Sequence, residues 1–333
     1  MGISFIDLSL SNIWRSGYKF RKGKRKTVEL EYFQYFLEKN LHELHGELNG
    51  KYRHNGYRKF IVTDSKRREI SVASIKDRIV HRLLYEYLVE IYDKTFIFDV
   101  WSCRKSKGLL GVIERMQKFL NKYPNSFVWR ADIKKFFDNV NHEILIRILA
   151  LRIFDNTASL LLKEVIGSYQ TSGVIRERER ESKTRRRKGI PIGNLTSQIF
   201  ANIYLNELDR FLKHTIKPQA YLRYGDDFII ISENLRQIKQ IREKTIEFLR
   251  EKLRLEINAK NDIIVKIRWG LNFLGVEIFP GGRRLNKRNW NRARARVNAQ
   301  NISSYSGLVK QHSKNKKIKE FNWIILEKLS DNF

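Results

Sequence analysis

The sequence contains very little cysteine and proline, and it has no long apolar run. With one cysteine, Cys103, among 333 residues, the chain cannot form an internal disulfide or a thiolate metal cluster. We expect Cys103 to be a small packed side chain. No apolar stretch approaches the length of a membrane span, and the N-terminus lacks a cleavable signal pattern. We therefore expect a cytoplasmic protein without a membrane anchor.

Negative charge is also scarce. The chain has 66 Lys and Arg against 36 Asp and Glu, which gives a formal net charge of +30 at pH 7. An excess of this size favours a polyanionic partner, because phosphate neutralisation and counterion release supply much of nucleic-acid affinity. Small acidic substrates would not need it. The 42% of hydrophobic residues can bury a substantial core, and only 4 prolines and no long Gly- or Ser-rich linker interrupt the chain.

The segment Tyr224-Gly225-Asp226-Asp227 lies between two apolar runs, 220–223 and 228–231. This pattern predicts two strands joined by a two-residue Gly-Asp turn, because such turns need positive φ angles that Gly and Asp tolerate. A plain surface turn with two solvated acids is the alternative. A further aspartate decides between these interpretations.

That aspartate is Asp132, which ends the apolar run Phe127-Val128-Trp129 and its two following residues. A strand that ends in a carboxylate, beside a hairpin with two more, predicts a site for hard divalent cations that prefer oxygen ligands. Paired metals about 4 Å apart activate an attacking hydroxyl and neutralise the leaving oxygens in displacement at phosphorus. The chemistry that this arrangement suits is nucleotidyl transfer.

Hydrophobic periodicity predicts alternating helices and short strands along the rest of the chain. Ser74 is expected to be the N-cap of one helix, with Asp77 in its first turn. Expected helices occupy 28–48, 75–91, 112–121, 142–152, 195–212, 235–252 and 318–329. Expected strands occupy 57–62, 69–72, 263–267 and 276–279, and the last two complete a small antiparallel sheet with the strands that carry the aspartates.

Two basic segments remain. Residues 176–188 alternate Arg and Glu and end in four basic residues, which favours a solvated hairpin or disordered insertion over a specific RNA contact. The tail from Arg283 onward interleaves basic residues with Trp290 and Trp323. A helical element that grips a duplex and a solvated basic face both fit this tail.

Several segments together resemble one family. Residues 130–137 resemble motif A of reverse transcriptases, 189–198 resemble motif B, 224–227 resemble motif C, and Phe273-Leu274-Gly275 is similar to the primer grip. The ordered set covers most of the chain. More narrowly, the sequence GIPIGNLTSQ at 189–198 resembles reverse transcriptases of diversity-generating retroelements, which copy a template RNA and mutate it at adenines to diversify a target gene.

The resemblance implies an α+β right-hand polymerase fold and RNA-directed DNA polymerase activity. Its expected parts are an N-terminal region with fingers at 1–126, a palm at 127–282 with a charged insertion near 171–188, and a short helical thumb at 283–333. The implied principal metal ligands are Asp132 and Asp226. Asp227 completes the metal site as a further ligand and is the third catalytic residue, the Ile133 carbonyl adds an oxygen, and the implied ion is Mg²⁺ or Mn²⁺.

The resemblance also implies a nucleotide-binding set and a steric gate. Arg68 matches the arginine that holds the incoming triphosphate, although a solvated strand arginine is the alternative. Phe137 matches the bulky residue that clashes with a ribose 2′-hydroxyl, so deoxynucleotides are expected. The whole implied set is Lys66, Arg68, Phe137, Ile192, Gly193 and Gln198.

Two positions depart from the common pattern. Most reverse transcriptases have Gln where this chain has Ile192, and an aliphatic side chain cannot make the hydrogen bonds of an amide, which predicts lower fidelity. Simple packing of the loop is the alternative for Ile192. Gly225 stands where Met or Ala is more common, and a Gly-Asp-Asp core is usual in viral RNA replicases. Phe137 argues against ribonucleotides, so RNA replication stays a minor alternative.

The implied partners are template RNA, the RNA/cDNA duplex, deoxynucleoside triphosphates and a small basic oligomeric accessory variability protein. The implied location is the cytoplasm, for a bacterial, archaeal or phage-encoded protein. One alternative function is a solitary bacterial reverse transcriptase of a phage-defence system. The other is a catalytically idle RNA-binding scaffold, which the intact trio of acids disfavours.

Overall fold

The computed structural model describes residues 5–63, 67–169 and 187–330. The chain forms two compact units. Unit 1 comprises Met1–Ile97, Ile133–Phe211 and Thr245–Asn258, and unit 2 comprises Phe98–Asp132, Leu212–Lys244 and Ala259–Phe333. Lys66 and most of the charged insertion expected near 171–188 lie outside the described residues.

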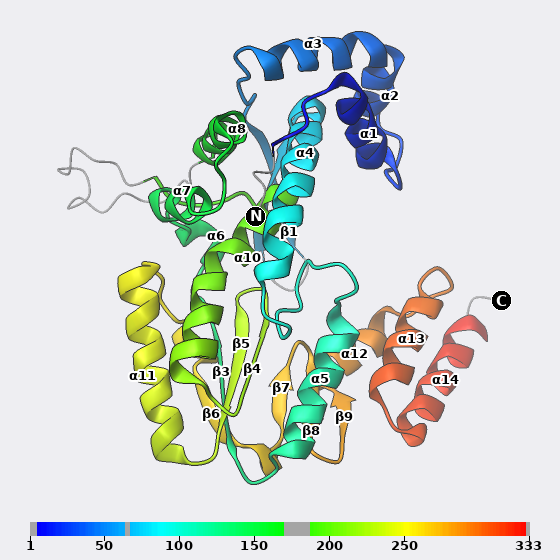
Figure 1. The fold of residues 1–333 in the computed structure, drawn as a ribbon. Coiled ribbons are helices and arrows are strands. Elements are labelled where there is room, and N and C mark those ends of the chain that lie inside the picture. Colours follow the sequence, from blue (N-terminus) through cyan, green and yellow to red (C-terminus); the bar gives the residue numbers. More distant parts are fainter. Residues whose placement is uncertain (1–4, 64–66, 170–186, 331–333) are drawn as a thin grey trace, which may run out of the picture. The chain divides into compact units, whose positions relative to one another are not determined.

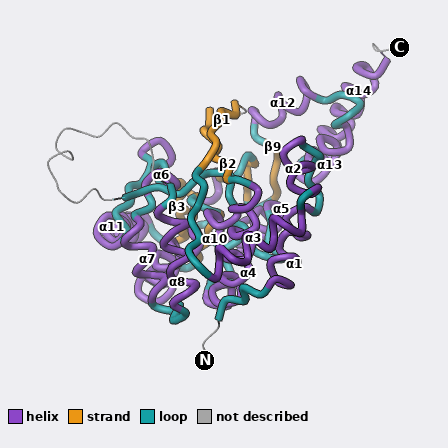
Figure 2. Tube along the Cα trace, turned by 90° about the horizontal axis from the view of Figure 1, so that it is seen from above, coloured by secondary structure: helices purple, strands orange, loops and turns teal. Residues whose placement is uncertain are grey.

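The described residues of unit 1 form helices and an antiparallel ribbon of β1 with β2, which is drawn in orange in Figure 2. The long helix α4 packs against α1, α8 and α10, and α7 packs against α8 and α10. The elements are α1 (Leu10–Arg21), α2 (Val28–Tyr35), α3 (Leu37–Asn49), β1 (Tyr57–Thr63), β2 (Arg67–Ala73), α4 (Ile75–Tyr92), α6 (Phe136–Asn139), α7 (His142–Ala150), α8 (Asn156–Gly167) and α10 (Leu195–Arg210).

Helix α4 follows directly from its sequence. The Ser74 hydroxyl accepts a hydrogen bond from the Asp77 backbone N–H at 3.2 Å, so the predicted N-cap is confirmed. Ile79 and Leu83 lie on the buried stripe of the helix. The single helix predicted for 28–48 was wrong, because α2 ends and α3 begins at Phe36, whose φ of −104° and ψ of 31° leave the helical region.

Unit 2 contains two antiparallel sheets. The first has the strand order β4-β5-β3-β6 and the second has the order β7-β8-β9. Figure 1 shows α5 alongside strands of this unit, and α5 packs against β4 and β8. The elements are α5 (Leu109–Lys122), β3 (Phe127–Asp132), β4 (Ala220–Tyr224), β5 (Asp227–Ser232), β6 (Ile263–Lys266), β7 (Leu271–Phe273), β8 (Val276–Phe279), β9 (Gly282–Leu285), α12 (Lys287–Arg296), α13 (Ile302–His312) and α14 (Asn315–Ser330). The unit boundary after Lys244 falls inside α11 (Leu235–Lys252).

Strand register decides which side chains meet in the first sheet. Val128 lies opposite Ile231, and Asp132 lies opposite Asp227. Since alternate residues of a strand share one face, these four side chains and Arg130 belong to the same face of the sheet. Val128 and Ile231 are fully buried in a core that also includes residues of α5, β7–β9 and α12–α14. One face therefore changes from apolar to acidic along β3.

Three expectations need correction. Strands at 263–267 and 276–279 do not share a sheet, because β6 pairs with β3 whereas β8 pairs with β7 and β9. Helix α5 begins at Leu109, three residues before its predicted start. Cys103 is exposed, with a φ of 54°.

In the described ranges, none of the helices combines the length and apolarity that crossing a bilayer requires.

Candidate active site

The predicted aspartate hairpin is present. Tyr224 pairs with Asp227, so Gly225 and Asp226 form the two-residue loop between β4 and β5. Gly225 has a φ of 65°, whereas Asp226 is not among the residues with positive φ, which is typical of a type II′ turn with Gly first. A Cβ added at Gly225 would lie 3.8 Å from the Ser102 hydroxyl, an ordinary contact. Backbone conformation, not space, therefore favours glycine here.

Asp132 and the hairpin lie side by side in unit 2. Asp132 is the last residue of β3 and is the direct cross-strand partner of Asp227, which opens β5. The Asn261 side-chain amide donates a hydrogen bond to one carboxylate oxygen of Asp132 at 2.8 Å. Asn261 was not predicted as a residue of the site. The register of β3 and β5 thus places Asp132 beside Asp227 and the turn that carries Asp226.

The electrostatics of Asp226 are those of a site that attracts cations. Burial raises the pKa of Asp226 to about 6, and the carboxylates of Asp132 and Asp227 push it in the same direction. The backbone N–H of Asp226 and the nearby Arg223 oppose this shift without cancelling it. Because three acids share one partly buried region, a bound cation would relieve their repulsion.

Asp227 differs from the other two acids because it is engaged by Arg130. The Arg130 guanidinium donates to one Asp227 oxygen at 3.0 Å and to the other at 2.7 Å. Burial raises the pKa of Asp227, and the hydrogen bonds from Arg130 act against that rise. Arg130 was not predicted, although its position two residues before Asp132 on the same strand was a usable signal.

The carboxylate oxygens of the site are donors of the kind that hold a divalent metal ion. Within the part of the chain that the structure describes, no group of three or more acid, histidine or cysteine side chains is arranged to hold a metal on its own. Mg²⁺ is commonly held by one or two carboxylates and completes its shell with water and substrate phosphate oxygens. Asp132 and Asp226 are carboxylates of this kind, whereas both oxygens of Asp227 accept hydrogen bonds from Arg130. Ile133, which follows Asp132, is buried in unit 1 and bridges to Ile257.

The predicted primer-grip residues form the hairpin between β7 and β8 in unit 2. Phe273 pairs with Val276, so Leu274 and Gly275 are the two loop residues. Their φ angles are 50° and 84°, as in a type I′ turn, and a left-handed leucine is an unusual conformation that surrounding contacts must maintain. The Asn289 amide donates to the Gly275 carbonyl at 3.1 Å and fixes the turn to α12.

The described nucleotide-binding candidates lie in unit 1, in and near the loop at 189–194 and on β2. The Ile190 N–H donates to the Phe137 carbonyl at 2.8 Å. On the other side of the loop, the Ser71 N–H donates to the Ile192 carbonyl at 3.0 Å, which ties the loop to β2. Gly193 has a φ of 109°, and a Cβ there would lie 2.9 Å from the Ile70 side chain. Backbone hydrogen bonds therefore connect three predicted segments of unit 1.

Two further predicted residues belong to these segments. Arg68 is exposed on β2, three residues before Ser71. Gln198 is exposed in the first turn of α10, directly after the loop. Unit 1 thus carries the described nucleotide-binding candidates, and unit 2 carries the aspartates and the primer-grip hairpin. Their individual roles remain predictions.

A buried polar network at the start of α4 was not predicted. Asp77 accepts hydrogen bonds from the Tyr52 hydroxyl at 2.6 Å and the Ser74 hydroxyl at 2.7 Å. The rings of His54 and His81 share a hydrogen bond of 3.1 Å between their Nε2 atoms, and burial lowers the pKa of His81 to about 3. Only the local Ser74–Asp77 spacing was visible in the sequence, because the other partners come from distant segments.

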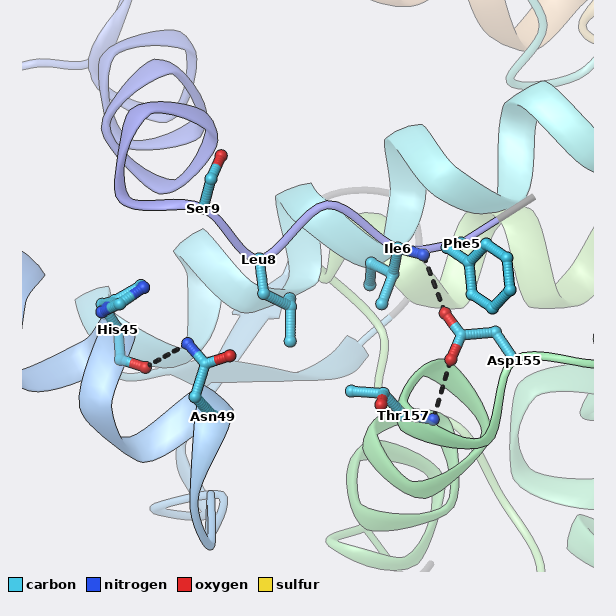
Figure 3. Close-up of a pocket in the computed structure, with 8 residues that line it drawn as sticks. All are labelled: Phe5, Ile6, Leu8, Ser9, His45, Asn49, Asp155 and Thr157. Carbon is cyan, nitrogen blue, oxygen red and sulfur yellow. Dashed lines mark hydrogen bonds between the residues drawn. The ribbon is translucent and has the colours of Figure 1, made fainter.

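A separate pocket of unit 1, shown in Figure 3, has a volume of about 310 Å³. Its lining residues are Phe5, Ile6, Leu8, Ser9, His45, Asn49, Asp155 and Thr157. One Asp155 oxygen accepts from the Ile6 N–H at 2.7 Å and the other from the Thr157 N–H at 2.8 Å. Both oxygens thus anchor local backbone, so this carboxylate secures the N-terminal segment and caps α8.

The chain was compared with known proteins. A family model described as reverse transcriptase (RNA-dependent DNA polymerase) matches residues 54–278. Protein YkfC of Escherichia coli is 25% identical over 266 residues, which cover 68% of each chain. The group II intron-encoded protein LtrA of Lactococcus lactis is 22% identical, over 64% of this chain and 44% of LtrA.

A solved structure shares the fold. The structure of apo telomerase from Candida tropicalis superimposes with a TM-score of 0.52 at 13% identity, over 83% of this chain and 57% of the telomerase chain. The chain therefore spans little more than half of that relative and less than half of LtrA. The family model, in contrast, covers more than half of the present sequence, and it includes the segments with Asp132, Asp226 and Asp227. The chain belongs to the reverse transcriptase family.

Proposed function

We propose that this protein is an RNA-directed DNA polymerase that extends a primer on a template RNA by metal-assisted nucleotidyl transfer. The observation that carries the proposal is the pairing of Asp132 with Asp227 beside the Asp226 turn, in a chain of the reverse transcriptase family. The net charge of +30 supports a nucleic-acid substrate.

In this proposal Asp132 and Asp226 supply the oxygen ligands for divalent metal, with Mg²⁺ as the expected ion and Mn²⁺ as the substitute. Bound metals would activate the primer hydroxyl and neutralise charge on the triphosphate. Asp227 completes the acidic site while it is bonded to Arg130. The Ile133 carbonyl is a proposed additional ligand, and it follows Asp132 directly in the chain.

The proposed nucleotide-binding residues each contribute a different contact. Arg68 and Lys66 hold the triphosphate, and the planar guanidinium suits phosphate oxygens because it presents several fixed donors. Phe137 excludes a ribose 2′-hydroxyl, so deoxynucleotides are the substrates. Gly193 and Gln198 line the base pair that forms, and Phe273, Leu274 and Gly275 hold the primer. Fingers at 1–126, a palm at 127–282 and a thumb at 283–333 are the proposed polymerase parts.

A finer proposal concerns fidelity. The Ile192 side chain is aliphatic and half-buried. The Ser71 N–H donates to the Ile192 carbonyl, and this hydrogen bond fixes the position of the loop. Without an amide at this position the nascent base pair loses a hydrogen-bonding contact, which fits error-prone copying at template adenines and a role in targeted gene diversification. Ile192→Gln should lower misincorporation opposite adenine in sequenced cDNA. An unchanged error spectrum would remove Ile192 from the mechanism.

The proposed diversification role includes a small basic oligomeric accessory protein and a cytoplasmic location. The similarity to LtrA favours a second candidate, a reverse transcriptase associated with a mobile intron. The genomic neighbourhood separates these roles. A near-repeat pair that differs at adenines supports diversification, whereas flanking intron RNA supports the second candidate.

Primer extension tests the central proposal. Purified protein with Mg²⁺, deoxynucleotides and a primed RNA template should make cDNA, and Asp226→Asn or Asp132→Asn should reduce the rate by about 10³-fold or more, because a metal site contributes several kcal/mol. Asp7→Asn, which changes an exposed acid of unit 1, is the matched control and should retain activity. Full activity in Asp226→Asn would place the metal site elsewhere.

A further inference from the structure

Arg130 makes contacts that connect two predicted functional hairpins of unit 2. Its Nε and one terminal nitrogen bind the two oxygens of Asp227. Its other terminal nitrogen donates to the backbone carbonyl of Asn272, in β7. The guanidinium carbon lies 5.8 Å from the centre of the Phe273 ring. One side chain thus reaches from the aspartate hairpin to the primer-grip hairpin.

The register of the sheet explains this reach. Arg130 lies opposite Ile229, so Asp227 is its diagonal neighbour on the same face of the sheet. The pair is mostly shielded from water, with exposed side-chain fractions of 17% for Arg130 and 15% for Asp227. A planar guanidinium has enough donors to bind a carboxylate with one edge and a carbonyl with another, which a lysine ammonium cannot reproduce in the same geometry.

The pairing also changes the charge of the site. Without Arg130, three carboxylates would share one partly buried region, and only bound metal ions would neutralise their mutual repulsion. With Arg130 bound, the charge of Asp227 is compensated and both of its oxygens are turned toward the guanidinium. Two acids, Asp132 and Asp226, then remain for metal.

We propose that Arg130 is a positioning residue that holds Asp227 away from the metal ions and fixes the primer-grip hairpin relative to the aspartate hairpin. This inference rests on the proposed function. Arg130 does not touch reacting atoms; it sets the charge of the metal site through Asp227 and the place of the primer terminus through Asn272 and Phe273. Its loss should therefore affect metal affinity and turnover in opposite directions.

The metal arm of the test uses Mn²⁺ titrated into the full-length, nucleic-acid-free protein and followed by electron paramagnetic resonance. Arg130→Met frees one carboxylate, so the affinity for Mn²⁺ should rise about tenfold, the effect of one nearby charge. The double variant Arg130→Met with Asp227→Asn removes both charges and should return to wild-type affinity. Equal affinity in wild type and Arg130→Met would overturn the proposal.

The turnover arm measures first-nucleotide addition on a primed RNA template. Arg130→Lys keeps a positive charge but loses the double contact, so Mn²⁺ affinity should stay near wild type while kcat falls roughly 10- to 100-fold, because small misplacements of reacting groups are costly. KM for the nucleotide should change little. A kcat of Arg130→Lys equal to that of the wild type would refute the positioning role. If Arg130→Met does not fold, Arg130→Lys still tests the proposal.

The matched control is Arg242→Lys. Arg242 makes an equivalent forked pair with Asp262 in the same unit, but Asp262 bonds to Trp129 and not to either hairpin. Its substitution should alter stability without altering Mn²⁺ affinity or kcat. A wild-type protein that extends no primer would refute the proposed function instead, and the metal arm would still decide the role of Arg130.

Discussion

Asp77 in unit 1 and Asp226 in unit 2 are two acids withdrawn from water, and their surroundings differ. Asp77 in unit 1 is fully buried and accepts hydrogen bonds from Tyr52 and Ser74 and from the backbone of Asn55. Asp226 in unit 2 lies beside two other carboxylates, and burial raises its pKa to about 6. The carboxylate of Asp77 is therefore surrounded by hydrogen-bond donors, whereas the carboxylate of Asp226 has two further carboxylates as neighbours.

The difference distinguishes an acid that stabilises the fold from an acid that a ligand or a reaction requires. A buried carboxylate that is surrounded by donors stabilises the fold, because its desolvation is compensated by charge-assisted hydrogen bonds. A carboxylate that is buried among other acids costs stability, and such sites persist where a ligand or reaction needs them. Substitution of each acid should therefore change stability with opposite sign.

The largest expected effect concerns Asp77. Asp77→Ala would leave the Tyr52 and Ser74 hydroxyls without their acceptor, and we expect the free energy of unfolding to fall by about 3 kcal/mol or more. Urea denaturation of the purified protein measures this. A loss below about 1 kcal/mol would show that the network does not hold α4 in place, and the comparison between the two acids would fail.

A smaller effect of the opposite sign is expected for Asp226→Asn. An acid whose pKa is raised in the folded state costs stability above that pKa, and the cost is relieved as pH falls from about 6 toward its ordinary value near 4. The amide should therefore raise the free energy of unfolding at pH 7, without metal, by about 1–3 kcal/mol. At pH 4 the gain should shrink. A destabilised variant at pH 7 would contradict this interpretation.

The pH dependence of metal binding sharpens the comparison further. Because a proton and a metal compete for the Asp226 carboxylate, the affinity for Mn²⁺ should be nearly constant above pH 7 and should fall about tenfold per pH unit below about 6. Calorimetric titration at several pH values measures this slope. Affinity that is unchanged between pH 7 and pH 5 would exclude Asp226 as a ligand.

Much of the candidate site was predictable because its signals are local. The Gly-Asp turn, the strand that ends at Asp132 and the Ser74 cap each depend on a few consecutive residues, and all three are present. The fork from Arg130 to Asp227 depends on which strand lies beside β3, and one sequence does not state that pairing. The contact between Arg130 and Asp227 can be predicted only after the register of β3 and β5 is known.

The errors in the fold have similar causes. No glycine or proline marks the break at Phe36, so periodicity alone joined α2 to α3. Strand β7 has three residues, too few for alternation to be visible, and its absence from the prediction assigned β8 to the wrong sheet. Cys103 lies in a segment without periodicity, where burial cannot be predicted from pattern.

A crystal structure of the full chain soaked with Mn²⁺ tests the central claim most directly, because anomalous scattering locates the ion without assumptions about activity. The account predicts Mn²⁺ about 2 Å from oxygens of Asp132 and Asp226, with Asp227 still bonded to Arg130. Mn²⁺ bound away from these two carboxylates, or coordinated by Asp227 after release from Arg130, would contradict it.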